Sequence, residues 1–506
     1  MKNINAIIVL FVSLITFVSC DTVLDEQPET FFNEEQIFSS EEGVESAING
    51  LYQSFADPGY HGSSIHGLVA PFSGKFFSNQ GASQDATSLN CLPNNTWLIR
   101  LWPAMYSTIN VSNVIIENLE NSTLPLANKD IALGQAYFIR AATYFDLVRY
   151  FGGVPLKTSP TTAQTLHTPR SSVEDTYALI IEDFEKAKQL LPNAGEYLID
   201  RPIKTAANAY LAKVYMTLAS ASNDKAMWKA AYDEAIEVYG KYSLTPTYAE
   251  LFELGNENTS ESIFEIQYGA NGAVRNSDVI RIYTLRNYYN YDTFGRVRPN
   301  KETYDQHVNQ YPGDPRIDAT FIANSYTTFD GRTVRLYPAQ SNGNDGYAAI
   351  KKYLEPNFNG TTANTNLIKI RYADVLLMLA EIENELNGPA NAYQYVNEVL
   401  ARARNTGSSI AAEPADWSGL SQDEFRERIM YERQYELLGE NHEFFDTRRR
   451  GYEYFLREVI EKHNNGPKGN RDFVYPVSVK NMLLPIPSIE ISGNQKITQA
   501  DQNPGY

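Results

Sequence analysis

The chain has 506 residues, 12 % of them aromatic, and its 43 Lys and Arg against 61 Asp and Glu give a formal charge of −18. This charge excludes nucleic acid and anionic membrane surfaces as partners, because both bind a basic face, so we expect a neutral or weakly charged ligand. Six histidines without an HExxH spacing, and two cysteines without a CxxC spacing, predict neither a cofactor nor a metal site.

The first 19 residues have the layout of a signal peptide. Lys2 is the positive charge, and the apolar run from Ala6 to Val18 is shorter than the roughly 18 residues of a membrane-spanning helix. We expect cleavage before Cys20 and acylation of this cysteine, which would anchor the protein durably. The alternative is an ordinary secretory signal with an incidental cysteine. Phe17 favours that alternative, since bacterial lipoproteins usually carry Leu there.

Three pairs of helices are predicted by apolar residues at helical spacing. The pairs cover about 138–148 with 177–191, 207–218 with 228–236, and 372–386 with 392–403. A capping-box pattern at Ser171 and Glu174 predicts the start of the second helix. Small residues on these faces allow close approach, as in tetratricopeptide-type pairs. Because no fixed 34-residue period is present, we do not expect a regular solenoid.

Two long regions, about 56–96 and 255–365, lack helical periodicity and are rich in Gly, Asn, Ser, Pro and Tyr. Long loops are usually functional or disordered, and the ring content argues against disorder. Aromatic faces beside amides and guanidinium groups can hold sugar rings or peptides. We therefore predict a ligand-binding surface formed by Asn94, Trp97, Tyr283, Tyr288, Tyr289, Tyr291 and Arg296. The alternative for each ring is that it only packs a loop onto the helical body.

Seven segments in a fixed order match the signatures of one family. They are Arg140–Pro155, Lys204–Tyr215, Asp314–Arg316, Arg371–Glu381, Glu432–His442 with Phe445-Asp446, Leu484–Pro487 and Gln502–Tyr506. Over nearly its whole mature length the chain therefore resembles the SusD/RagB family of outer-membrane nutrient-binding lipoproteins.

The resemblance implies a mostly α-helical fold, with a scaffold of tetratricopeptide-like pairs and a loop-rich half that carries the ligand site. Residues 1–19 would be the signal peptide and residues 20–506 a single SusD-like domain that contains the two long loop regions. Family members sit on a TonB-dependent outer-membrane transporter of the SusC type and capture glycans, or in some members peptides. The helical face would then dock the transporter, and the lipid on Cys20 would hold the protein at the surface of the outer membrane.

The charged residues of the signatures are expected to hold the scaffold and not the ligand. They are Arg140, Asp146, Arg149, Asp374, Glu381, Arg433, Glu436 and Asp446. Within or beside helices, guanidinium and carboxylate groups can form bidentate pairs between neighbouring elements. Trp102 and Tyr106 resemble the family's packing pattern, so they are left out of the predicted site.

Two other classes of function stay open. A surface glycoside hydrolase would need two carboxylates about 5 to 10 Å apart. The chain has no GxSxG motif, however, and its helices do not alternate with strands as in a barrel. A structural adaptor would bind only protein, which the aromatic-rich loops argue against. We therefore expect a non-enzymatic protein that binds a glycan and passes it to the transporter, with a peptide-binding member of the family as the first alternative.

Overall fold

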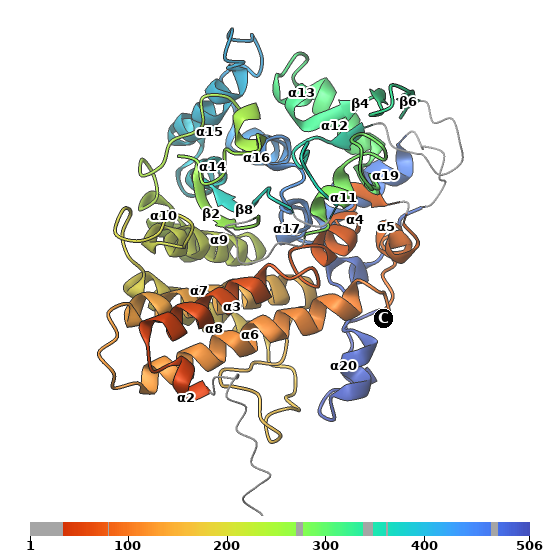
Figure 1. Ribbon diagram of the computed structural model, residues 1–506. Coiled ribbons are helices and arrows are strands. Elements are labelled where there is room, and N and C mark those ends of the chain that lie inside the picture. The colour runs from red at the N-terminus through yellow and green to blue at the C-terminus, as the bar shows by residue number, and fades with distance from the viewer. Residues whose placement is uncertain (1–33, 79, 270–276, 337–347, 361–362, 467–473) are drawn as a thin grey trace, which may run out of the picture.

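The computed structural model describes residues 34–78, 80–269, 277–336, 348–360, 363–466 and 474–506. The signal peptide and Cys20 lie outside these residues, so both remain predictions. Figure 1 shows a mostly helical protein, and the predicted fold class is confirmed. Within the described ranges, no helix is both long and apolar enough to cross a bilayer.

Antiparallel helices form the lower half and the upper left of the molecule (Figure 1). The lower helices are α2 (Glu34–Ile37), α3 (Glu41–Phe55), α6 (Leu98–Asn121), α7 (Lys129–Phe151) and α8 (Val173–Leu190). Above them lie α9 (Lys204–Ser222), α10 (Lys225–Ile236), α14 (Tyr372–Asn387), α15 (Pro389–Arg404) and α16 (Gln422–Leu437). Helix α7 packs on α8, α9 on α10 and α14 on α15, which confirms the three predicted pairs.

The ends of these helices follow local sequence signals. Helix α7 stops at Gly152, whose φ of 74° lies in the left-handed region that glycine adopts most easily. Helix α8 starts one residue later than predicted. Its N-cap is Ser172, whose Oγ accepts a hydrogen bond from Asp175 N at 2.9 Å, and not Ser171.

The two regions without periodicity contain short elements. The first holds η1 (Ile65–Val69), α4 (Ala70–Phe72), β1 (Phe76–Ser78), η2 (Gly81–Ser83) and α5 (Gln84–Thr87). The second holds β2 (Ser262–Ile266), α11 (Val279–Tyr283), β3 (Val297–Pro299), α12 (Lys301–Gln310), α13 (Arg316–Thr320), β4 (Phe321–Ala323), β5 (Ser325–Thr327), β6 (Thr333–Arg335) and β7 (Ala348–Ile350). It is followed by β8 (Leu367–Arg371), and η3 (Ala249–Phe252) precedes it.

Antiparallel strand pairs tie these segments together. The pairs are β1 with β3, β2 with β8, β4 with β7 and β5 with β6. The first pair joins the two regions, with Phe76 opposite Pro299. The second places Ser262 opposite Arg371, so the second region leaves the helical scaffold and returns to it at neighbouring points.

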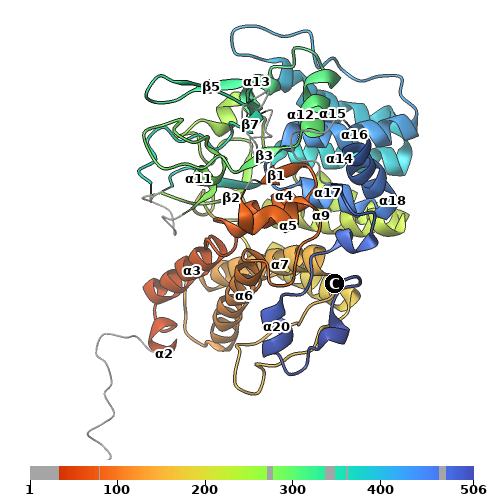
Figure 2. The same ribbon diagram turned by 90° about the vertical axis from the view of Figure 1, so that its right-hand side faces the viewer.

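The C-terminal part of the chain packs beside both halves (Figure 2). It consists of α17 (Glu443–Arg449), α18 (Tyr452–Phe455), η4 (Leu456–Glu461), α19 (Lys462–Asn465), η5 (Val479–Met482), α20 (Ser488–Gly493) and η6 (Gln499–Asp501). Asn503 donates hydrogen bonds from Nδ2 to the carbonyl oxygens of Phe151 and Leu484, at 2.9 and 2.7 Å. These bonds hold the C-terminal tail against the end of α7.

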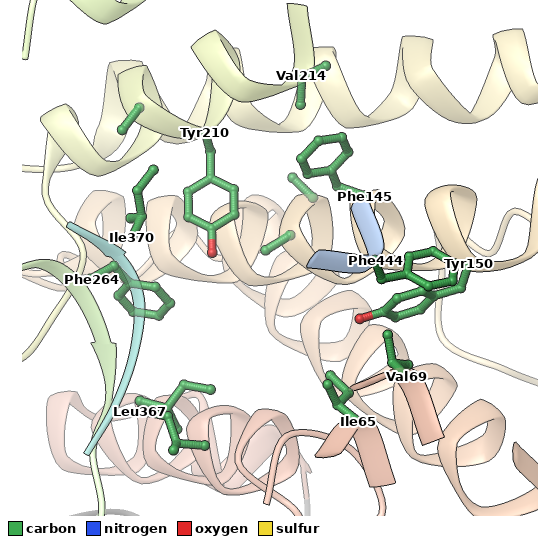
Figure 3. Packing of buried hydrophobic residues seen from close by; sticks show 14 of the residues in the cluster. Ile65, Val69, Phe145, Tyr150, Tyr210, Val214, Phe264, Leu367, Ile370 and Phe444 are labelled. Atoms are coloured by element: carbon green, nitrogen blue, oxygen red, sulfur yellow. The ribbon is translucent and has the colours of Figure 1, made fainter. Parts of the chain in front are cut away.

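One hydrophobic core spans the helical and the loop-rich halves. Figure 3 shows Tyr210 of α9 above Phe264 of β2, with Tyr150 of α7 beside Phe444 of α17. The ring centroids of Tyr150 and Phe444 lie 5.3 Å apart in an edge-to-face contact. Phe138 of α7 makes similar contacts of 5.1 Å with Tyr210 and Phe264. Such pairs contribute about 0.5–1.5 kcal/mol each beyond the burial of their area.

The charged signature residues form buried ion pairs, as predicted. Arg140 donates from Nε and Nη2 to the two carboxylate oxygens of Asp183, both at 2.8 Å. Arg433 forms ion pairs with Asp374 and Asp446, each at 2.9 Å. The other pairs are Arg149 with Asp146, Arg449 with Glu381, and Glu436 with Arg316, Arg371 and Arg402. These side chains connect elements of the scaffold to one another.

Candidate ligand-binding surface

Three of the predicted tyrosines lie on a loop between α11 and β3. Backbone hydrogen bonds of 2.8 Å, from Phe294 N to Arg281 O and from Arg296 N to Ile282 O, hold the returning chain beside α11. Asn287, with a φ of 58°, lies near the reversal of the chain. Figure 2 shows α11 in the upper half of the molecule, above α3. The loop is therefore clamped at its base and presents its side chains outward.

Tyr288, Tyr289 and Tyr291 form a continuous group of half-buried rings. The centroids of Tyr288 and Tyr289 are 4.9 Å apart at an interplanar angle of 83°, and those of Tyr289 and Tyr291 are 5.6 Å apart at 42°. Two buried rings support the group from below, Tyr326 under Tyr288 and Phe358 under Tyr291. Burial raises the pKa of Tyr289 to about 12, so its phenol is neutral and can donate a hydrogen bond at physiological pH.

Two guanidinium groups lie over Phe294, a ring on the returning side of the same loop. The Cζ atoms of Arg281 and Arg296 lie 4.8 and 3.8 Å from the ring centroid of Phe294, within the range of cation–π contacts. Arg281 also forms an ion pair with Asp292 at 3.1 Å. Arg296 has no ion pair with the residues that the structure describes, and burial lowers its pKa. The N–H groups of Arg296 are thus available to a ligand.

A further ring near the group was missed by the sequence prediction. Phe329 is 53 % exposed, and its backbone N–H donates to Asn287 O at 2.9 Å. It therefore lies beside the tyrosine loop, although it follows β5. Phe329 stands in a stretch without helical periodicity, so the criterion that selected the tyrosines would have found it. We call Tyr288, Tyr289, Tyr291, Phe294, Arg296 and Phe329 the tyrosine surface.

Trp97 and Tyr283 do not belong to this surface, which corrects the prediction for both. Trp97 is 8 % exposed, and its Nε1 donates to Ser83 Oγ at 3.0 Å. Its indole lies directly on Gly67, where an added Cβ would be 2.5 Å from Cε2. Tyr283 is 1 % exposed and stacks on Tyr353 with the centroids 4.9 Å apart. Both rings pack the interior, so a ligand cannot reach their faces.

Asn94 is exposed. Among the described residues, no hydrogen bond connects Asn94 to the tyrosine surface. Its neighbour Asn95 is the structural residue of the pair. The side chain of Asn95 accepts from Trp97 N at 2.8 Å and donates to Ala82 O at 2.7 Å. Of the seven predicted ligand residues, the structure thus gathers Tyr288, Tyr289 and Tyr291, and Arg296 lies on the same loop over Phe294. Whether they contact a ligand stays a prediction.

Known proteins resemble this chain over its whole length. Residues 196–506 match the model of the SusD family, and residues 23–216 match a family described as starch-binding associating with outer membrane. A SusD-like protein P2 of Formosa agariphila is 29 % identical, with 99 % of each chain covered.

Solved structures share the fold. A SusD homologue of Bacteroides thetaiotaomicron superposes with a TM-score of 0.77 at 22 % identity, covering 94 % of this chain and 99 % of the other. A laminarin-binding SusD-like protein gives a TM-score of 0.71 at 21 % identity, covering 92 % of this chain and 100 % of the other. The fold is the SusD-like one, and the chain belongs to the SusD family.

Proposed function

We propose that this protein is a surface lipoprotein that binds a neutral glycan through the tyrosine surface and passes it to a TonB-dependent outer-membrane transporter of the SusC type. The observation that carries the proposal is the group of three half-buried tyrosines on one loop, on which Arg296 also lies without an ion pair to the residues that the structure describes. Rings can cover the apolar faces of sugars, while phenol and guanidinium N–H groups bind their hydroxyls. The match to a starch-binding family and the laminarin-binding structural neighbour support this ligand class.

The angles between the rings favour a curved glycan. Tyr288 and Tyr289 are nearly perpendicular, and Tyr289 and Tyr291 are inclined by 42°. Sugar rings that stack on successive tyrosines must therefore be rotated relative to one another. A helical polysaccharide satisfies this condition, whereas a flat ribbon would contact only one ring face. The formal charge of −18 also disfavours acidic glycans.

The other parts of the proposal concern the anchor and the partner. Cleavage after residue 19 and acylation of Cys20 would place residues 20–506 at the outer membrane as one SusD-like domain. The helical half would face the transporter and the tyrosine surface would select the glycan. We also propose that the protein does not hydrolyse its ligand, since its likeness is to a family of binding proteins.

Titration calorimetry with purified protein tests the glycan proposal. We expect amylose or laminarin to bind, and cellulose oligosaccharides to bind more weakly. Absence of binding to any neutral polysaccharide, together with binding to a peptide mixture, would replace the glycan by a peptide. Labelling with radioactive palmitate tests the anchor, because the label should enter the wild type and not the Cys20→Ser variant.

A further inference from the structure

A cleft of about 560 Å³ shares no residue with the tyrosine surface. Its walls are the α8–α9 loop (191–203), the segment after α10 (240–243) and the segment that leads into β2 (258–265). In Figure 1, α9 and α10 lie on the left of the molecule, whereas α11 and β4 lie on the right. The volume falls within the range of about 300–1,000 Å³ that is typical of small-molecule sites.

The cleft combines rings with uncommitted polar groups. Tyr197 and Tyr242 are half-buried and line it from two different walls. The side chains of Asp200, Lys241 and Ser243 also line it, and they make no hydrogen bond or ion pair with other residues that the structure describes. A carboxylate can accept from two neighbouring hydroxyl groups, while the ammonium and hydroxyl groups can donate. This set of donors and acceptors, next to ring faces, suits a neutral polyhydroxylated ligand.

The wall that carries Asp200 is held in place from beneath. Arg201 donates from Nη2 to Glu45 Oε1 at 3.1 Å and to Asn49 Oδ1 at 2.6 Å, both on α3. Its guanidinium also lies over the ring of Tyr52, with Cζ 4.3 Å from the centroid. The α8–α9 loop is therefore anchored to a long helix, so the cleft is formed before a ligand arrives and little ordering is needed on binding.

The rim of the cleft is unusually apolar for an exposed loop. Ile199 is 81 % exposed and Leu198 is 50 % exposed, and both line the cleft beside Asp200. Aliphatic side chains held in water at the mouth of a site can cover the apolar face of a sugar ring when it binds. The aliphatic rim can thus contact the apolar face of a saccharide, and the polar groups of the cleft can bind its hydroxyl groups.

We propose that this cleft is a second saccharide site, which takes a short neutral saccharide between Tyr197 and Tyr242, with Asp200 binding its hydroxyl groups. The choice of ligand class rests on the proposed glycan function, but the site is independent of the tyrosine surface. A protein with both sites holds a polymer at the tyrosine surface and a short fragment in the cleft.

Saturation-transfer NMR with maltose, cellobiose, laminaribiose and xylobiose tests the second site. The starting protein carries Tyr288→Ala and Tyr289→Ala, which disable the tyrosine surface. We expect at least one disaccharide to bind this double variant. Adding Ser243→Trp, which fills the cleft from an exposed position, should abolish the signal, and adding Asp200→Ala should weaken binding about tenfold or more. The matched control Glu237→Gln changes an exposed carboxylate at the C-cap of α10, which does not line the cleft, and should have no effect.

Two results would overturn the second site: no disaccharide binding in the double variant, or binding that persists after Ser243→Trp. Polysaccharide binding by the wild type, measured in parallel, tests the proposed function separately.

If the wild type binds a polysaccharide but the cleft binds no disaccharide, the proposed function is supported and the second site is refuted. If disaccharides bind only through the cleft and the tyrosine variants leave polysaccharide binding unchanged, the tyrosine surface falls instead. Circular dichroism confirms that each variant is folded.

Discussion

Arg371 donates a hydrogen bond from Nη1 to Glu436 Oε1 across 2.7 Å, and neither side chain is more than 1 % exposed. Glu436 also accepts from Arg316 at 3.0 Å and forms an ion pair with Arg402. Arg371 in turn reaches Glu440 at 2.8 Å. Guanidinium groups from β8, α13 and α15 thus meet at one carboxylate of α16, which fixes the arrangement of the loop-rich half on the helices.

Loss of a cation from this network should be costly. Replacing Arg371 by Met leaves Glu436 and Glu440 buried with less compensation, so we expect the free energy of unfolding to fall by about 3–5 kcal/mol. Urea denaturation followed by circular dichroism measures the change. The matched control is Lys229→Met, which removes the exposed ion pair with Asp233 and should cost at most about 1 kcal/mol. Equal losses in the two variants would show that the buried network does not stabilise the fold.

The same network predicts acid sensitivity. Burial alone would raise the pKa of Glu440, but Arg371 and Lys352 outweigh it and lower the pKa from 4.5 to about 2. A carboxylate with a depressed pKa stabilises the folded state above pH 4.5 and loses this contribution as the pH falls toward 2. The free energy of unfolding should therefore decrease steeply between these values. In Glu440→Gln the decrease should be shallower, and a curve parallel to that of the wild type would contradict the assignment.

Glu443 should give the folded state the opposite dependence of stability on pH, in a higher pH range. This buried carboxyl lines a small cavity with Lys75, accepts a hydrogen bond from Gly439 N, and has its pKa raised by burial to about 7. Because the folded state binds the proton more tightly, stability should decline as the pH rises from 4.5 through 7. Glu443→Gln keeps the acceptor without the charge, so at pH 8 it should raise Tm and increase the free energy of unfolding by about 3 kcal/mol. The exposed control Glu453→Gln should leave Tm unchanged, and a destabilised Glu443→Gln at pH 8 would refute the prediction.

Binding and packing rings should respond differently to truncation. Tyr288→Ala or Tyr289→Ala should weaken polysaccharide binding by about 1–3 kcal/mol, measured by calorimetry, with little loss of stability. Trp97→Ala should instead lower the free energy of unfolding by about 3–5 kcal/mol, because it removes a buried indole that rests on Gly67. The control Tyr283→Phe should bind like the wild type, since the ring stays in the interior. Normal affinity in both tyrosine-to-alanine variants would remove these rings from the site.

The helical scaffold could be predicted because its signals are local. Apolar residues at helical spacing located all three helix pairs, and Gly152 marked the end of α7. The start of α8 was missed by one residue because Ser171 and Ser172 are adjacent serines, and only the backbone shows that Ser172 is extended and caps the helix. The sequence also predicted that the charged signature residues form ion pairs within the scaffold. Their partners were not predicted, since Arg140 and Asp183 are 43 residues apart.

The site was only partly predictable because burial in a non-periodic segment is decided by distant residues. Tyr283 belongs to a helix of five residues, too short to show a periodicity, and it is covered by Tyr353, which is 70 residues later. Trp97 stands just before α6 and is covered by Gly67. The cleft has walls from three segments, so no single stretch of sequence points to it.

The pairing of β2 with β8 has a consequence for how this chain can change over evolutionary time. The ladder places residues 266 and 367 opposite each other, so the hundred-residue excursion between them is closed at its base like a hairpin. Insertions and deletions at turns within the excursion leave the distance between its two attachment points unaltered. Arg316 and Lys352, which lie within the excursion, must stay, because they form buried ion pairs with Glu436 and Glu440. The turns between these fixed contacts can therefore change in length and sequence without moving the helices.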